Sequence, residues 1–231
     1  MVLKFLIIVP HGFCDASVPE RHCDRRAMEE AMALKSLIES KNYSVDFFKA
    51  DRYRSELDYN RKQAKPSSIR GQIRDLIKKY STEKHHIIIF EMHSFPDNYT
   101  AYDFKGANVA LLSIPRYEKE MNFVAEYIQK NTGLKIIPVK GTETNDIQWD
   151  SDESVSANIN HYLIEFNENK KLFSDYDAAK IHPALLEGAI KFTQVKMTPW
   201  YIYAVVIILL LLFLFLLYSV LPQMHFGYLF P

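Results

Sequence analysis

The chain has 231 residues, of which 48% are hydrophobic, and its 28 Lys and Arg residues balance its 28 Asp and Glu residues. This length accommodates one globular domain of ordinary size and an additional segment. The balanced charge argues against nucleic acid as a partner and against a strongly acidic one.

Strands and helices are predicted to alternate through most of the chain. An apolar run at 3–9 predicts a strand, and apolar residues at helical spacing over 26–40 predict a helix that Asp24 could cap. Ile87 to Ser94 reads as a strand buried on both faces. The other predicted strands lie at 43–48, 109–114, 136–139 and 161–166, and the other helices at 66–80, 117–131 and 183–194. This pattern favours an α/β fold, with a mostly parallel or mixed sheet flanked by helices on both faces.

The C-terminal part of the chain has no charged side chain from residue 197 onward. Residues 202–220 are almost all Val, Ile, Leu and Phe, and as a helix they would be about 28 Å long. We therefore expect a single C-terminal transmembrane helix at 199–221, which would use the lipid bilayer as a partner. The N-terminal domain would be cytosolic, and the membrane could be that of a virion or an organelle.

Two predicted strands end in a histidine, namely His11 and His93. Neutral imidazoles from two strand ends and a carboxylate from a helix start are the ligands of an open zinc site, and Asp24 supplies that carboxylate. Each residue alone has a simpler explanation, as a hydrogen-bonded histidine or a helix cap. Glu91 could orient a neighbouring histidine as an outer partner of the metal site. His22 and the two cysteines are alternative ligands in the same loop.

Hydrolysis of an amide needs a proton carrier and a group that fixes the substrate. Glu165 lies within an apolar strand, where a carboxylate is costly unless it faces a polar site; the alternative is a charge that faces water. Arg54, Asn60 and Arg61 place two guanidinium groups and an amide in one loop, which favours a substrate with a free carboxylate. An ordinary solvated charged loop is the alternative.

Cys14 and Cys23 are the two cysteines of the chain, nine residues apart. Two cysteines do not make a disulfide framework, so we expect a reducing compartment.

Several of these motifs occur in an order that resembles a known family. They are Pro10-His11-Gly12, Arg54, Asp58-Tyr59-Asn60-Arg61, Glu91-Met92-His93-Ser94 and the strand with Glu165. Their order is similar to that in N-formylglutamate amidohydrolases, relatives of zinc carboxypeptidases with a phosphorylase/hydrolase-like α/β fold. The resemblance covers roughly residues 5–167. It implies that His11, Asp24 and His93 bind Zn²⁺ or another divalent metal, that Glu165 works on water, and that Arg54, Asn60 and Arg61 receive a carboxylate.

These observations predict four segments: an amidohydrolase-like domain at 1–167, a linker with a juxtamembrane helix at 168–198, the transmembrane helix at 199–221 and a short tail at 222–231. The predicted function is a membrane-anchored, metal-dependent amidohydrolase acting on an N-acylated amino acid or peptide-like substrate. The alternative is a membrane-anchored structural or adaptor protein, for example a viral minor capsid or membrane protein with protein assembly partners. A third hypothesis is a module that binds a carboxylate ligand without hydrolysing it.

Overall fold

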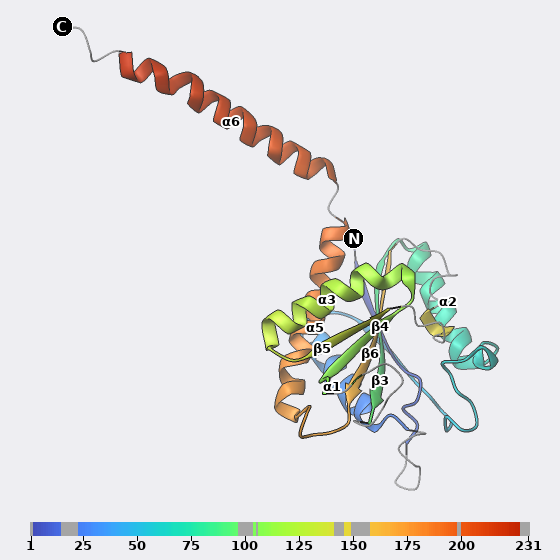
Figure 1. Cartoon of the computed structure of the whole chain (residues 1–231). Helices are drawn as coiled ribbons and strands as arrows, with labels where there is room; N and C mark the ends of the chain where they lie inside the picture. The colour runs from blue at the N-terminus through green and yellow to red at the C-terminus, as the bar shows by residue number, and fades with distance from the viewer. Residues whose placement is uncertain are drawn as a thin grey trace. The chain divides into compact units, whose positions relative to one another are not determined.

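The computed structural model describes residues 2–14, 23–96, 104, 106–140, 146–148, 158–197 and 200–226 (Figure 1). The strands are β1 (Leu3–Val9), β2 (Val45–Lys49), β3 (His86–Phe95), β4 (Val109–Ser113), β5 (Ile136–Lys140) and β6 (Ile159–Asn167). The helices are α1 (Arg25–Ser40), α2 (Ser68–Thr82), α3 (Glu118–Thr132), α5 (Asp175–Met197) and α6 (Trp200–Phe226), with short 3₁₀ turns η2 (Lys62–Ala64) and η3 (Pro115–Tyr117).

The six strands form one mixed sheet in the order β2-β1-β3-β6-β4-β5. Neighbouring strands run parallel, except that β4 runs antiparallel to β6. Because β3 lies between β1 and β6 and all three are parallel, their carboxyl ends meet at one edge of the sheet. In open α/β sheets, ligands bind at such an edge.

The sheet is covered on both faces, as the alternation of side chains along β1 illustrates. Phe5, Ile7 and Val9 belong to a buried cluster that includes residues of α1, α3 and α5. Leu6 and Ile8 point to the opposite face and join a cluster with residues of α2. The prediction of strands covered by helices on both sides is therefore confirmed for these elements.

Helix α5 begins well before the predicted helix at 183–194. Ser174 starts it, because its backbone N–H and hydroxyl both donate to Asp177 Oδ2, at 3.1 and 2.7 Å, and Asp177 N donates back to Ser174 Oγ at 3.2 Å. This reciprocal pair is a form of capping box. Pro183, which the sequence interpretation placed at a helix start, lies inside the helix. The part of the predicted linker that precedes residue 183 is therefore helical from Asp175 onward.

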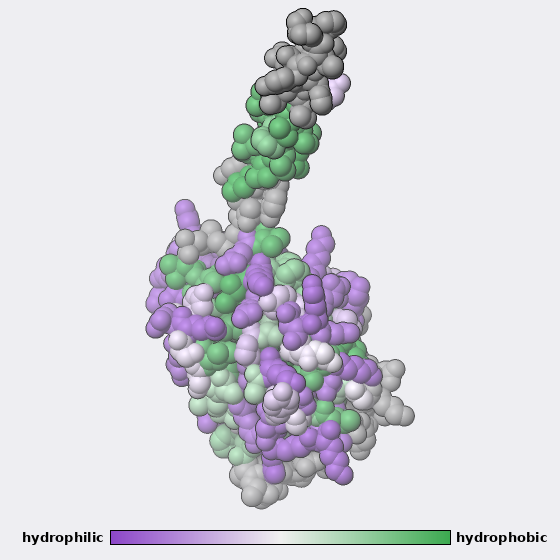
Figure 2. Space-filling model, turned by 90° about the vertical axis from the view of Figure 1, so that its left-hand side faces the viewer, coloured by the Kyte–Doolittle hydropathy of each residue, from purple (hydrophilic) through white to green (hydrophobic). Residues whose placement is uncertain are grey.

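The predicted transmembrane anchor and membrane location are corrected by the structure. In the part of the chain that it describes, no helix combines the length and the apolarity needed to cross a membrane. Where its side chains are described, helix α6 is apolar (Figure 2). Contacts divide the chain into Met1–Thr193 and Gln194–Pro231, and α6 belongs to the second unit.

Candidate metal centre

His11 follows β1 in a tight turn. Gly12 N donates to Val9 O at 3.2 Å, and a Cβ at residue 12 would lie 2.8 Å from Val9 Cγ1, so a side chain there would collide. The turn brings the His11 ring into the interior, where the residue is 3% exposed. Glycine at position 12 therefore permits the turn that delivers this imidazole.

Asp24 stands at the start of α1 but does not cap it with its side chain. Its carboxylate instead faces the two histidines: Oδ2 lies 3.1 Å from His11 Nδ1 and 3.0 Å from His93 Nδ1. Its backbone N–H donates to His11 O at 3.1 Å, which ties the helix start to the turn after β1. The simpler explanation of Asp24 as a helix cap is therefore not what the geometry shows.

His11, Asp24 and His93 form a buried trio whose ligand atoms all lie within 4.8 Å of one another. His93 comes from β3, and the two imidazole rings meet edge to face with centroids 4.9 Å apart. Two imidazole nitrogens and one carboxylate oxygen are a donor set that suits Zn²⁺ and related divalent ions. These residues could therefore hold a metal ion.

Each histidine ring also contacts a second carboxylate through its Nε2 atom, on the side opposite to Nδ1. His11 Nε2 lies 2.9 Å from Asp58 Oδ1, and His93 Nε2 lies 2.9 Å from Glu91 Oε1. The second oxygen of Glu91 lies 3.0 Å from Nε2 of the fully buried His161. Carboxylates in this position fix the ring orientation of metal-binding histidines, and here the two Nδ1 atoms face Asp24 Oδ2. The Glu91 contact is the one the sequence suggested, whereas Asp58 and His161 were not assigned a role.

The electrostatics keep the carboxylates of this cluster ionised. Burial opposes the charge on Asp24, but the attraction and hydrogen bonds of His11 and His93 outweigh it and hold the Asp24 pKa well below its usual range. Burial likewise opposes ionisation of Glu91, but hydrogen bonds with His161 and His93 lower its pKa to about 2. Burial disfavours charge on His93 too, yet the bonds to Asp24 and Glu91 raise its pKa to about 10. Asp24 and Glu91 are thus ionised carboxylates in contact with the histidines of the cluster.

Glu165 lies on β6 beside His93, with which it pairs in the register of β3 and β6. Burial raises its pKa to about 8; Asp24 and Glu91 add to the increase, and His93 and Arg54 oppose it. A carboxyl group with a pKa near neutrality can both take up and release a proton, as a general acid or base must.

The raised pKa of Glu165 predicts a pH dependence of stability in the metal-free protein. Between pH 4.5, the ordinary pKa of a glutamate, and about pH 8, the folded state keeps a proton that the unfolded state has released. The free energy of unfolding should therefore fall as pH rises through this window, by about 3 kcal/mol from this group. Glu165→Gln should remove the contribution of this group. The free energies of unfolding measured with denaturant at pH 5 and pH 8 should therefore differ less in the variant than in the wild type. Equal pH dependence in both proteins would contradict the assignment.

The three residues predicted to bind a substrate carboxylate gather around Asp58. Its Oδ2 lies 3.3 Å from Arg54 Nε and 3.6 Å from Arg61 Nε, and its Oδ1 accepts from Asn60 N at 3.0 Å. Burial opposes ionisation of Asp58, but His11 and Arg54 are among the groups that outweigh it and hold its pKa well below its usual range. Two partly exposed guanidinium groups thus lie beside the carboxylate that contacts His11.

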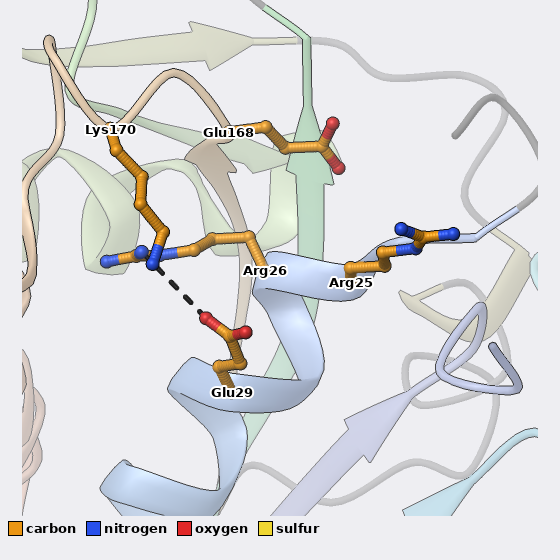
Figure 3. Close-up of a pocket in the computed structure, with 5 residues that line it drawn as sticks. All are labelled: Arg25, Arg26, Glu29, Glu168 and Lys170. Carbon is orange, nitrogen blue, oxygen red and sulfur yellow. Dashed lines mark ion pairs between the residues drawn. The ribbon is translucent and has the colours of Figure 1, made fainter. Parts of the chain in front are cut away.

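A pocket of about 200 Å³ lies at the start of α1 and is lined by Arg25, Arg26, Glu29, Glu168 and Lys170 (Figure 3). Figure 3 shows the side chains of Arg25 and Arg26 extending to different sides of the start of α1, with Lys170 reaching toward Arg26. Arg26 Nη1 lies 3.9 Å from Glu29 Oε2, whereas Glu168 Oε1 accepts from Ser94 Oγ at 2.7 Å. Arg25 directly follows Asp24 in the chain, and Glu168 binds Ser94, the residue after His93.

Cys14 and Cys23 form a disulfide bond, so the expectation of unpaired cysteines is wrong. The bond joins the turn after His11 to the residue before Asp24. The number of cysteines does not show how close they lie, whereas the fold brings the two ends of this loop together with a Cα–Cα distance of 5.4 Å, within the range that a disulfide spans. Neither cysteine is therefore a free competitor for the metal, and His22 lies outside the described residues.

No protein-family model and no curated protein sequence matches the chain. Solved structures do match. The gene product Atu2144 from Agrobacterium tumefaciens has a TM-score of 0.60 at 11% identity, over 81% of this chain and 91% of its own. The N-acetylmuramoyl-L-alanine amidase from Clostridium difficile 630 has a TM-score of 0.53 at 11% identity, over 84% and 98%. An N-acetylmuramoyl-L-alanine amidase of Nostoc punctiforme has a TM-score of 0.49 at 12% identity, over 82% and 97%.

These likenesses correct the family prediction. The Clostridium difficile neighbour is named as an N-acetylmuramoyl-L-alanine amidase, so the assignment to the N-formylglutamate amidohydrolases is wrong. At such low identity the likeness shows the fold alone. The chain therefore has an amidase-like α/β fold whose sheet edge carries a cluster able to hold a metal.

Proposed function

We propose that the protein is a metal-dependent amidase that hydrolyses an N-acylated amino acid or a peptide-like amide with a free carboxylate. The convergence of His11 Nδ1, Asp24 Oδ2 and His93 Nδ1 carries the proposal, because it is a metal donor set at the ligand-binding edge of an amidase-like fold. The proposed metal is Zn²⁺. When bound, it would supply a Lewis acid that polarises the amide carbonyl and makes nearby water more acidic.

The remaining chemistry falls to side chains of the chain. Glu165 would accept a proton from the attacking water as the new C–O bond forms, and would deliver it to the leaving amine nitrogen as the C–N bond breaks. The products are a carboxylate and a free amine. The position of Glu165 beside His93 and its raised pKa support this role.

Arg54 and Arg61 would hold the substrate carboxylate, with Asn60 beside them. Their position supports this role, because both guanidinium groups lie near Asp58, which contacts the candidate ligand His11, and guanidinium groups bind carboxylates well. Asn60 Oδ1 is buried, and within the described part of the chain no hydrogen-bond partner reaches it, so it is an acceptor that a substrate N–H could satisfy.

The carboxylate requirement can be tested with two substrates that differ in one group. N-acetyl-L-alanine carries the carboxylate, and N-acetyl-L-alanine amide lacks it. Arg54→Gln should raise the KM for the acid by about 10- to 100-fold, since a hydrogen bond to a charged group is worth roughly 1.5–3 kcal/mol, and should leave the KM for the amide within about twofold. Arg52→Gln, on an exposed neighbour, is the matched control. Equal effects on both substrates would contradict the role of Arg54.

A further inference from the structure

Arg70 is a cation in the protein interior that the proposed reaction does not use. It lies in the first turn of α2, is 1% exposed and is among the largest fully buried side chains. Its Nη1 donates to Tyr59 O at 2.7 Å and to Arg61 O at 3.4 Å, and its Nη2 donates to Asp146 O at 3.0 Å. Burying a guanidinium group is costly, and these carbonyl contacts offset part of that cost.

The contacts of Arg70 join two segments that are far apart in the sequence. Tyr59 and Arg61 flank Asn60, and the backbone carbonyl of Asn60 accepts from Asp146 N at 3.5 Å. The start of α2 is itself fixed, because the Ser67 side chain accepts from Arg70 N at 3.3 Å. A capped helix end therefore presents Arg70 to the loop at a defined place.

The loop that Arg70 holds also carries the outer partner of a candidate metal ligand. Asp58 directly precedes Tyr59, its Oδ1 lies 2.9 Å from His11 Nε2, and its backbone carbonyl accepts from Arg61 N at 3.1 Å. The same turn therefore places the His11 partner and the residues proposed to bind the carboxylate.

We propose that Arg70 is a positioning residue of the metal centre, which fixes this loop and, through Asp58, keeps His11 in the orientation that turns Nδ1 toward Asp24 and His93. The inference deepens the proposed function and rests on it for the metal site. Arginine suits this role because its planar guanidinium group donates to several carbonyl oxygens at fixed angles, whereas the charge and the donors of lysine are concentrated on one nitrogen atom.

Zinc affinity provides the test, since it does not depend on turnover. Competition with a chromophoric chelator should show that Arg70→Gln weakens zinc binding by roughly tenfold, within the range known for loss of outer partners of metal-binding histidines. Arg70→Lys should have a smaller effect. Arg74→Gln is the matched control, because Arg74 lies one turn further along α2 and donates from the surface to Lys65 O at 2.9 Å; it should bind zinc like the wild type.

A double-mutant cycle with Asp58→Asn separates positioning from general destabilisation. If Arg70 acts through Asp58, Arg70→Gln should weaken zinc binding little further once Asp58 is replaced, whereas independent effects would multiply. Thermal unfolding of the metal-free variants checks that each is folded under the assay conditions.

The outcomes distinguish this inference from the proposed function. Zinc affinity of Arg70→Gln equal to that of the wild type, or independent effects in the cycle, would overturn the role of Arg70 even if hydrolysis is observed. The predicted weakening and coupling in a protein that hydrolyses no amide would support the role of Arg70 and overturn the amidase. A wild-type protein that binds no zinc would overturn both.

Discussion

Glu165→Gln is expected to lower kcat for N-acetyl-L-alanine by about 10²- to 10⁴-fold, the range that general acid–base catalysis contributes. Glutamine keeps the size of the side chain but cannot carry the proton from water to the leaving amine. Steady-state rates of the zinc-loaded proteins check this, and zinc stoichiometry should be the same in both because Glu165 is not among the three candidate ligands.

The matched control for Glu165 is Glu126→Gln, an exposed glutamate on α3. It should hydrolyse the substrate at the wild-type rate. A Glu165→Gln protein that keeps most of its activity would remove Glu165 from the mechanism, whatever the metal content.

His93→Ala should have the second large effect, on both metal binding and stability. Loss of a direct ligand should weaken zinc binding by more than about 100-fold, beyond the 10- to 100-fold loss typical of outer partners. It would also leave Asp24 without one of its two histidine partners in a buried site, which should destabilise the metal-free protein by about 3–5 kcal/mol. Calorimetric zinc titration and urea unfolding measure the two effects.

His85→Ala is the control for that variant, since His85 pairs with Glu83 outside the cluster. It should keep wild-type zinc affinity. If His93→Ala bound zinc as tightly as His85→Ala, the trio would not be the metal site.

The sequence predicted the strand ends well because a buried strand has an unambiguous signature. A run of four large apolar residues defined β3, and the residues that follow such runs in parallel strands meet at one sheet edge. This pattern alone predicts that His11 and His93 lie close together. Asp24 joined them as the carboxylate nearest a helix start.

The outer partners were harder to predict because they depend on contacts across the chain. Asp58 is 47 residues from His11, and His161 is 70 residues from Glu91. Asp58 stood in a recognisable Asp-Tyr-Asn-Arg run, yet nothing local shows that its carboxylate faces a histidine. The burial of Arg70 was harder still to predict from the sequence, since an arginine in the first turn of a helix usually lies in solvent.

The errors at the C-terminal side have physical reasons too. Pro183 suggested a helix start, but the Ser174 and Asp177 pair had already begun α5. Apolar composition alone suggested a membrane anchor, although no described helix meets the requirements of a span.

The disulfide near the N-terminus could not be predicted from composition either, because the pairing follows from the geometry of the loop between His11 and Asp24.

The central claim is most directly tested by removing the metal with a chelator and adding zinc back while hydrolysis of N-acetyl-L-alanine is followed. The account predicts that the chelated protein is inactive and that activity returns in proportion to added zinc, reaching its maximum at about one ion per chain, as expected for a single catalytic site. Full activity in the chelated protein, or zinc that binds and restores none, would contradict it.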